Sequence, residues 1–365
     1  MAGIYCRDEA HEGVFALVRK IAVVLLVVAM FFAAGYLQEN AGNLADIGRS
    51  ALTRIGLDRV IPSLSASPPQ PVKLTYIPAT SSTPAGKERV TVYFSDPDAM
   101  FLVPVSRVID KTEYPVRAAL DEFLKGPRAD SGLMKAAPPM SINRVTIANG
   151  VLSVDLPSEV IEVSAKWGST GATMALDGIL STCAEQSWVR SVRFLVNGMT
   201  APVLFHGISG SEPFKVVHKT SDGQQVWLYL ALYVGNRAYL VPEQVALKSQ
   251  GPADAVKQSL ELLKQDLLRG DFRLRATVDP AVKVRSVRIE NRTAYIDVSS
   301  RFREAFGKDP VRQSLMIDSI VLTATSFSGI EKVQFTVDGK TIAETFGHIN
   351  LGAAIARPRW INPEP

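Results

Sequence analysis

Residues Val145–Leu156 read VTIANGVLSVDL, and residues Val287–Val298 read VRIENRTAYIDV. In the first stretch, apolar residues alternate on both sides of Asn149-Gly150, which is typical of a β-hairpin because both turn positions tolerate positive φ. The second stretch repeats this pattern 142 positions later. That spacing is too long for a solenoid and predicts two homologous domains.

Other segments match in the same order, with offsets between 138 and 142. The matches are Leu102–Pro104 with Leu240–Pro242, Val116–Leu120 with Val256–Leu260, Asp177 with Asp318, Val192–Phe194 with Val333–Phe335, and Phe205 with Phe346. Chance alternation in apolar strands would not keep so many matches in register. We therefore expect one domain over residues 88–212, a linker over 213–221 and a second domain over 222–357.

Both predicted domains have the same order of elements. Each begins with two short strands, followed by a helix that ends at Gly126-Pro127 in the first domain and spans about Pro252 to Arg269 in the second. After the hairpin comes a second helix, over about 172–186 or 310–325, and then a last hairpin that turns at Asn197-Gly198 or Asp338-Gly339. This order predicts an α+β fold, in which each domain has a small mixed or antiparallel sheet with two helices packed on one face.

The N-terminal part of the chain differs in character. Residues 21–37 (IAVVLLVVAMFFAAGYL) carry no charge and follow Arg19-Lys20, which predicts a transmembrane helix with residues 1–20 in the cytoplasm and the domains extracytoplasmic. Residues 38–87 are expected to form a juxtamembrane segment and a Pro/Ser-rich linker. The alternative is a cleaved signal peptide, because Ala33-Ala34-Gly35 offers small residues for cleavage.

Composition excludes several functional classes. The 365 residues hold two Cys and four His, too few for a disulfide framework or a Cys-rich metal site. The net charge of +4 is too small to indicate nucleic-acid binding. Cys183 falls at an apolar position of a predicted helix, which favours a buried structural thiol.

No catalytic constellation emerges from the spacing of polar residues. The four histidines are scattered, and neither Asp155 with Asp297 nor Asp177 with Asp318 forms a local pair, because each aspartate lies in a different domain. Turn or helix capping is the simpler interpretation of these carboxylates. We therefore predict no catalytic residues, no metal, no cofactor and no enzymatic activity.

Basic residues crowd one part of the second domain. They form a possible surface for an acidic partner or for anionic lipid, although a solvated strand face is the simpler interpretation. Aromatic residues do not alternate with them, which argues against nucleic acid. The residues are Arg273, Arg275, Lys283, Arg285, Arg288 and Arg292.

The sequence resembles the GerM-domain family of sporulation and germination proteins. The likeness is carried by Phe101–Val105, Leu124–Pro127, Val145–Leu156 and Val192–Gly198, and by Leu240–Pro242, Val287–Val298 and Val333–Gly339 in the second domain. It implies a fold similar to ring-building motifs and a non-enzymatic, extracytoplasmic role in assembling a complex between mother cell and forespore. Lipid anchoring through a cysteine, which the resemblance also implies, has no counterpart here, since no cysteine follows residues 21–37.

Three hypotheses remain from the sequence. The first is a membrane-anchored scaffold that binds other envelope proteins of sporulating cells and could form oligomers. The second is a module that binds peptidoglycan or a germinant in the cleft between the domains. The third is an enzyme, which would need a deep pocket lined by polar groups from both domains.

Overall fold

The computed structural model describes residues 73–364, which belong to one compact unit. No helix within these residues has the length and apolarity needed to span a bilayer. The predicted transmembrane segment, 21–37, and the cytoplasmic segment, 1–20, lie outside the described residues.

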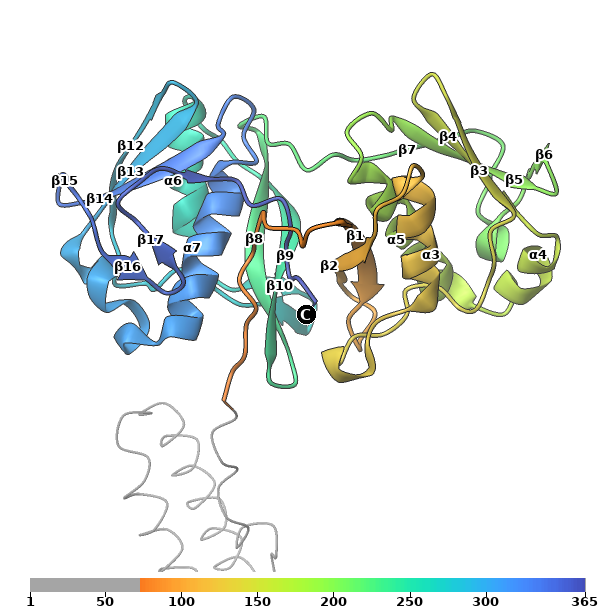
Figure 1. Ribbon diagram of the computed structural model, residues 1–365, viewed down its shortest axis with the longest axis horizontal. Helices are drawn as coiled ribbons and strands as arrows, with labels where there is room; N and C mark the ends of the chain where they lie inside the picture. Colours follow the sequence, from red (N-terminus) through yellow and green to blue (C-terminus); the bar gives the residue numbers. More distant parts are fainter. Residues whose placement is uncertain (1–72, 365) are drawn as a thin grey trace, which may run out of the picture. The chain divides into compact units, whose positions relative to one another are not determined.

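The described chain contains the same series of elements twice (Figure 1). The first repeat contains β1 (Lys87–Ser95), β2 (Leu102–Asp110), α3 (Pro115–Lys125), β3 (Arg144–Ala148), β4 (Val151–Leu156), α4 (Glu159–Ser164), α5 (Gly168–Ala184), β5 (Ser191–Val196), β6 (Met199–Thr200) and β7 (Phe214–Lys215). The second repeat contains β8 (Gln225–Val234), β9 (Arg237–Ala246), α6 (Pro252–Leu262), β10 (Leu267–Arg269), β11 (Phe272–Leu274), β12 (Val284–Glu290), β13 (Thr293–Val298), α7 (Pro310–Ala324), β14 (Lys332–Val337), β15 (Lys340–Thr341), β16 (Thr345–Phe346), β17 (Ile349–Asn350) and β18 (Ile355–Ala356).

The main strands of each repeat divide between two sheets. One is a hairpin, β1–β2 or β8–β9, and the other has five strands, in the order β3-β4-β5-β6 with β7 on β5, or β12-β13-β14-β15 with β18 on β14. Among the paired strands of residues 73–364, β4–β5 and β13–β14 are parallel, because a helix connects the two strands of each pair.

The helices lie between these two sheets. In Figure 1, α3 and α5 stand between the β1–β2 hairpin and the sheet that contains β3 and β4, and α6 and α7 stand in the same way in the second repeat. The α+β class and the packing of both helices on one sheet face agree with the sequence prediction. The hairpin forms a separate layer on the other side of the helices, so β1 is buried along Val90–Ser95 on both of its faces.

One predicted element is wrong. The sequence predicts a helix from about Pro252 to Arg269, but α6 ends at Leu262 and residues 267–269 form β10, which pairs with β11. Gly270, with φ of +62°, makes the tight turn between these strands. Leu263 and Leu267 fit a helical spacing, but Leu263 is buried after the helix has ended.

The predicted hairpin turns are confirmed by positive φ values at both central residues. These are 51° and 75° at Asn149-Gly150, 49° and 80° at Asn197-Gly198, and 50° and 75° at Asp338-Gly339. The matching turn of the second repeat, Asn291-Arg292, has φ of 49° and 60°. Arg292 therefore adopts the left-handed conformation without being glycine.

The segment that leads into β1 was predicted as the end of a linker over 38–87. In its described part, Thr75 pairs with the backbone of β9, where Ala238 N donates to Thr75 O at 2.8 Å. Tyr76 and Leu74 pack against a cluster of buried residues that includes Tyr229 and Leu315. Residues 73–86 therefore contact the second repeat although β1 belongs to the first.

Candidate functional site

The predicted basic residues occupy two separate places. Arg273 lies on β11, and Arg275 follows that strand and pairs with Ala231 of β8. Lys283 precedes β12, whereas Arg285 and Arg288 lie on that strand and Arg292 lies in the turn after it.

Acidic neighbours compensate most of this charge. Arg288 pairs with Glu290 at 3.0 Å and its guanidinium lies over the ring of Tyr295. The side chains of these pairs are largely exposed, and exposed pairs contribute little to stability. The surface is therefore of mixed sign. The other pairs are Arg273 and Arg275 with Asp266, Arg285 with Asp338, and Arg292 with Glu331.

Asp155 and Asp297 have the same role in both repeats. Asp155 Oδ1 accepts from Gly198 N at 2.8 Å, and Asp297 Oδ1 accepts from Gly339 N at 2.7 Å. Each carboxylate therefore caps the turn of the last hairpin, which confirms the structural interpretation of these aspartates.

Asp177 and Asp318 occupy equivalent positions in the two repeats but have different surroundings. Asp318 is buried on α7 and accepts hydrogen bonds from Tyr76 Oη and Ala79 N, both at 2.8 Å. It thereby holds the lead-in segment on the second repeat. Asp177 lies at the same place on α5 but faces a groove between the repeats.

The remaining chemically active side chains have structural surroundings. Burial raises the pKa of Cys183 to about 12, as expected for the inert thiol predicted from the sequence. His218 approaches two backbone carbonyls, with Nδ1 3.0 Å from Ala184 O and Nε2 2.9 Å from Val189 O. Within residues 73–364, no group of three His, Cys, Asp or Glu side chains is placed to hold a metal ion.

A segment that lies outside both predicted domains contacts both repeats. We call residues 358–364 the C-terminal strap. Asn362 lies between β2 and β9, where its Nδ2 donates to Pro104 O and to Leu240 O, and its Oδ1 accepts from Leu240 N, all within 2.9 Å. The strap therefore satisfies backbone groups of both hairpins, which would otherwise be unpaired edges.

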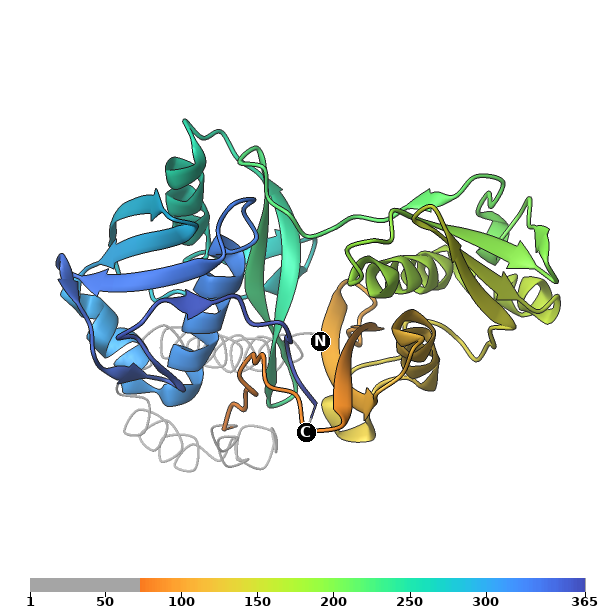
Figure 2. The same ribbon diagram turned by 45° about the horizontal axis from the view of Figure 1, so that its top comes forward.

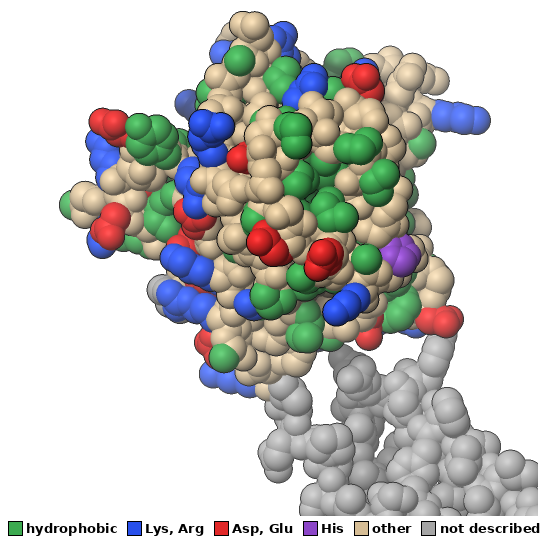
Figure 3. Space-filling view, turned by 90° about the vertical axis from the view of Figure 1, so that its right-hand side faces the viewer, with side chains coloured by type: hydrophobic (Ala, Val, Ile, Leu, Met, Phe, Trp, Pro, Cys, Tyr) green, Lys and Arg blue, Asp and Glu red, His purple; other side chains and the backbone are tan. Residues whose placement is uncertain are grey.

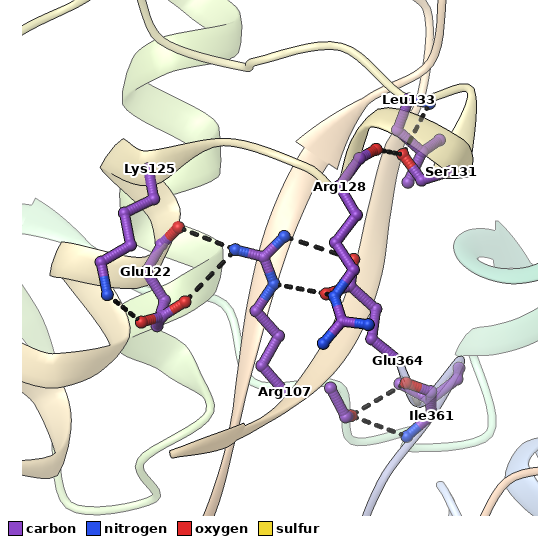
Figure 4. Close-up of polar contacts among 9 residues, drawn as sticks. Arg107, Glu122, Lys125, Arg128, Ser131, Leu133, Ile361 and Glu364 are labelled. Atoms are coloured by element: carbon purple, nitrogen blue, oxygen red, sulfur yellow. Dashed lines mark hydrogen bonds and ion pairs between the residues drawn. The ribbon is translucent and has the colours of Figure 1, made fainter. Parts of the chain in front are cut away.

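A buried ion-pair network fixes the end of the strap (Figure 4). Arg107 donates from Nε and Nη2 to the two carboxylate oxygens of Glu364, at 2.7 and 3.2 Å, in a fork arrangement. Arg128 also forms an ion pair with Glu364. Glu122 Oε2 accepts a hydrogen bond from Nη1, the third guanidinium nitrogen of Arg107. Arg107 and Glu364 are buried, so each charge depends on the other.

A groove of about 670 Å³ lies between the two repeats, and we call it the inter-repeat groove. One wall is the hydroxyl-rich face of α5, and the opposite wall comes from the β8–β9 hairpin of the second repeat. Its volume is typical of small-molecule sites. Polar residues on the two walls include Ser169, Thr170, Thr173, Asp177 and Ser181 from α5 and Trp227, Glu243 and Arg269 from the second repeat.

Two carboxylates of the groove have raised pKa values. Burial raises the pKa of Glu243 above its ordinary value, and Arg269, which donates to Glu243 Oε2 at 2.9 Å, offsets part of this effect. Desolvation also raises the pKa of Asp177. Carboxylates with raised pKa values in a cleft are candidates for ligand contacts.

Lys219 lines the groove next to aromatic residues of both repeats. Its ammonium lies 4.5 Å from the ring centroid of Tyr93 and 5.9 Å from that of Trp227, so one cation joins aromatic rings of both repeats. Trp227 Nε1 is buried and has no hydrogen-bond partner among the described residues. A ligand in the groove would therefore meet aromatic, hydroxyl and carboxyl groups together.

Sequence reasoning missed the strap and most groove residues. Their contacts join positions more than one hundred residues apart, such as Arg107 with Glu364, and no local pattern marks such pairs. The Leu-Val-Pro match offered the only local signal, because a proline inside a strand indicates an edge position.

Comparison with known proteins gives consistent matches. The profile of the family described as "Germane: Sporulation and spore germination" matches residues 91–201 and 227–343. The spore germination protein GerM of Bacillus subtilis is 29% identical over 139 residues, which cover 37% of this chain and 38% of that protein. The matched region thus spans well under two thirds of that relative.

A solved structure of two tandem domains shows the same fold. The tandem GerMN domains of the sporulation protein GerM from Bacillus subtilis align with a TM-score of 0.57 at 18% identity, covering 76% of this chain and all of that one. The first GerMN domain of the same protein covers 36% of this chain and 97% of its own length, at 27% identity and a TM-score of 0.30.

Proposed function

The chain belongs to the Germane family of sporulation and spore germination proteins, and we propose that it acts there as a non-enzymatic, membrane-anchored scaffold. In this role it would bind other envelope proteins and help to assemble a complex that spans the space between mother cell and forespore. The observation that carries the proposal is the pairing of two family modules whose outward surfaces differ.

The contrast between the modules is clearest on the outward faces of the two five-stranded sheets. Ala148 is exposed on this face of the first repeat, where the second repeat has the exposed Glu290; their strand partners, Val151 and Thr293, are half-buried and buried. Leu195, partner of Thr200, corresponds to Thr336, partner of Thr341. Modules that keep one fold but change its exposed side chains are suited to binding two different partners.

The end of the first repeat is also rich in exposed apolar residues. Figure 3 looks onto this end, where apolar side chains are spread over the face and charged ones interrupt them. Met199 is 73% exposed, Val203 48% and Ile147 47%. Apolar side chains that gather on one face can form a protein-binding surface, and we place the partner contact at this end of the first repeat.

Anchoring is the part of the proposal that depends on residues 21–37. An uncleaved apolar helix there, preceded by Arg19-Lys20, would leave residues 73–364 outside the cytoplasm. Protease added to intact protoplasts should then digest the repeats but leave residues 1–20 protected. Release of the whole chain into the soluble fraction would contradict the anchor and support cleavage.

The scaffold role is tested in the sporulating host. We expect gene deletion to lower the yield of heat-resistant spores or their germination, and in-cell crosslinking through the first repeat to capture an envelope protein. Leu195→Lys should abolish this capture and leave folding intact, because the side chain faces outward. Thr341→Lys serves as the control, because Thr341 is exposed on β15 of the second repeat and its side chain has no hydrogen bond within residues 73–364. Normal spores after deletion would refute the proposal.

A second candidate function is binding of a peptidoglycan fragment or a germinant, and the inter-repeat groove favours it. Retention of the chain on purified cell walls, lost after digestion of the glycan, would support this function. Thr173→Trp, which fills the groove from an exposed position of α5, should abolish retention. Turnover of the glycan by the chain would instead contradict the non-enzymatic part of the proposal.

A further inference from the structure

A second cavity, of about 460 Å³, lies on the other side of Tyr93, Lys219 and Pro242, which line both cavities. Its walls come from β1 of the first repeat, from Tyr229 and Leu322 of the second repeat, and from the segment Arg357–Ile361. The cavity therefore exists only where both repeats and the C-terminal strap come together. We call it the junction cavity.

Three guanidinium groups line the junction cavity, and the described residues offer no carboxylate within ion-pair distance of any of them. They belong to Arg89, Arg357 and Arg359. Most other arginines in the described chain are paired, including the ten of 237–312. The concentration of uncompensated positive charge at this cavity is therefore unusual for this molecule.

The hydrogen bonds of these arginines go to neutral acceptors. Arg357 donates to Leu322 O at 2.7 Å, to Thr325 Oγ1 at 3.1 Å and to Tyr229 Oη at 2.8 Å, which fixes its position without neutralising it. Arg89 donates to Ser82 O from Nε at 3.2 Å, and its Nη1 is buried without a partner. Burial lowers the pKa of Arg89, as expected for a cation without a counter-charge.

The one carboxylate of the cavity is already engaged. Glu185 Oε1 accepts from Tyr93 Oη at 2.5 Å and lies 3.5 Å from Lys219 Nζ. The charges of Glu185 and Lys219 compensate each other. The three arginines therefore have no carboxylate of the cavity as a counter-charge. Guanidinium groups bind carboxylate and phosphate through paired N–H donors, so their natural complement is a ligand with more than one such group.

We propose that the junction cavity binds a small, freely diffusing polyanion that carries two or more carboxylate or phosphate groups. Arg357 supplies a fixed charge at the floor, Arg89 a second charge from β1, and Arg359 an exposed charge held over the ring of Trp360 at the mouth. Because Arg89 lies on β1 and the other two arginines lie in the segment Arg357–Ile361, bound ligand joins the first repeat to the C-terminal segment and thereby stabilises the assembled pair of repeats.

The test uses the full chain in non-ionic detergent at constant ionic strength. Citrate and pyrophosphate serve as probes of carboxylate and phosphate chemistry, and micelles doped with phosphatidylglycerol serve as the lipid arm. We expect citrate or pyrophosphate to raise Tm by about 2 °C or more, because a ligand that binds only the folded state stabilises it. Isothermal titration then gives Kd for the probe that binds.

Substitutions at the mouth locate the site. Arg359→Gln is expected to weaken Kd about tenfold, and Arg359→Glu more, because a charge-assisted contact is lost or reversed. Arg359 is exposed, so both variants should fold. Arg144→Gln is the matched control, since Arg144 is an exposed arginine of β3, without an ion pair among the described residues and away from the cavity.

Several results would overturn the proposal. One is the absence of any rise in Tm with both soluble probes. Another is an equal Kd for wild type and Arg359→Glu. A response confined to the phosphatidylglycerol micelles would show that the arginines bind a lipid surface rather than a free ligand.

Discussion

Arg292 occupies a backbone conformation that its equivalent in the first repeat, Gly150, adopts without steric cost. Its φ is 60°, in the left-handed region, where the Cβ of an L-residue crowds the following carbonyl. The exposed ion pair with Glu331 compensates only a small part of this strain.

We expect Arg292→Gly to stabilise the protein. Relief of the left-handed strain contributes about 1–2 kcal/mol, and the greater freedom of glycine in the unfolded chain offsets about 0.5–1 kcal/mol. A net gain of about 0.5 kcal/mol remains after loss of the exposed pair. Urea denaturation followed by circular dichroism measures the change.

The first repeat provides the reciprocal control. Gly150→Ala should destabilise the protein by about 1 kcal/mol, since an added Cβ would be strained at φ of 75° and would lie 2.5 Å from Arg190 Nε. Arg190 also donates to Asn149 O at 2.6 Å, so its movement would cost a hydrogen bond. Unchanged stability in both variants would show that these turns do not store strain.

Cys183 should be unreactive in the folded protein. Burial raises its pKa to about 12, so the thiolate, which is the reactive form, is absent at pH 7–9. In a Cys6→Ser variant, a thiol reagent should label no cysteine under native conditions and one after denaturation. Labelling that increases between pH 7 and 9 without denaturant would contradict the buried position.

At the scale of the elements, the C-terminal strap stabilises the fold through a small number of identifiable hydrogen bonds. Asn362 makes three hydrogen bonds to buried backbone groups and has φ of 44°. Asn362→Gly keeps this conformation accessible and removes the bonds, so about 3 kcal/mol of stability should be lost. Thermal unfolding measures the loss.

Asn197→Gly is the appropriate control for the strap. Asn197 has φ of 49° in an exposed turn, and its side chain has no hydrogen bond within residues 73–364, so stability should change little. Equal losses from Asn362→Gly and Asn197→Gly would mean that the backbone conformation, rather than the bridge between hairpins, accounts for the effect.

The elements that the sequence predicted well are those with local signals. Asn-Gly turns define the hairpins, and Gly126 ends α3 because its φ of 88° cannot continue a helix. The segment after α6 was misassigned because Leu263 and Leu267 fit a helical spacing as well as a short strand. The aspartates that cap the last hairpins could be predicted because both repeats place them at equivalent positions.

The site could not be predicted in the same way. The junction cavity and the inter-repeat groove draw on residues from both repeats and the strap, and their relation depends on tertiary packing. The basic stretch attracted attention because its residues are close in sequence, yet acidic neighbours such as Asp266, Asp338 and Glu331 compensate them. Arg89 and Arg357, far apart in sequence, line one cavity.

On the scale of the whole molecule, duplication left two hairpins with a free edge each, and the strap lies on both. Direct contacts between the repeats are both apolar and polar, because buried residues of the two repeats belong to one hydrophobic cluster. Tyr239 Oη donates to Ser131 O at 2.7 Å, and Arg237 pairs with Asp130 at 2.7 Å. The strap adds to these contacts a set of hydrogen bonds and a buried ion pair that connect it to both hairpins.

Removal of the strap should uncouple the repeats. We expect the complete chain to unfold in a single calorimetric transition, and a chain that ends at Arg357 to unfold in two, because β2 and β9 lose their shared partner and Arg107 loses Glu364. Arg107→Met in the truncated chain tests whether the unpaired charge alone causes the change, since it removes that charge but does not restore the bridge. If the truncated chain still unfolds in one transition at an unchanged Tm, the direct contacts suffice to hold the repeats together. If Arg107→Met restores a single transition, the buried charge rather than the strap governs the coupling.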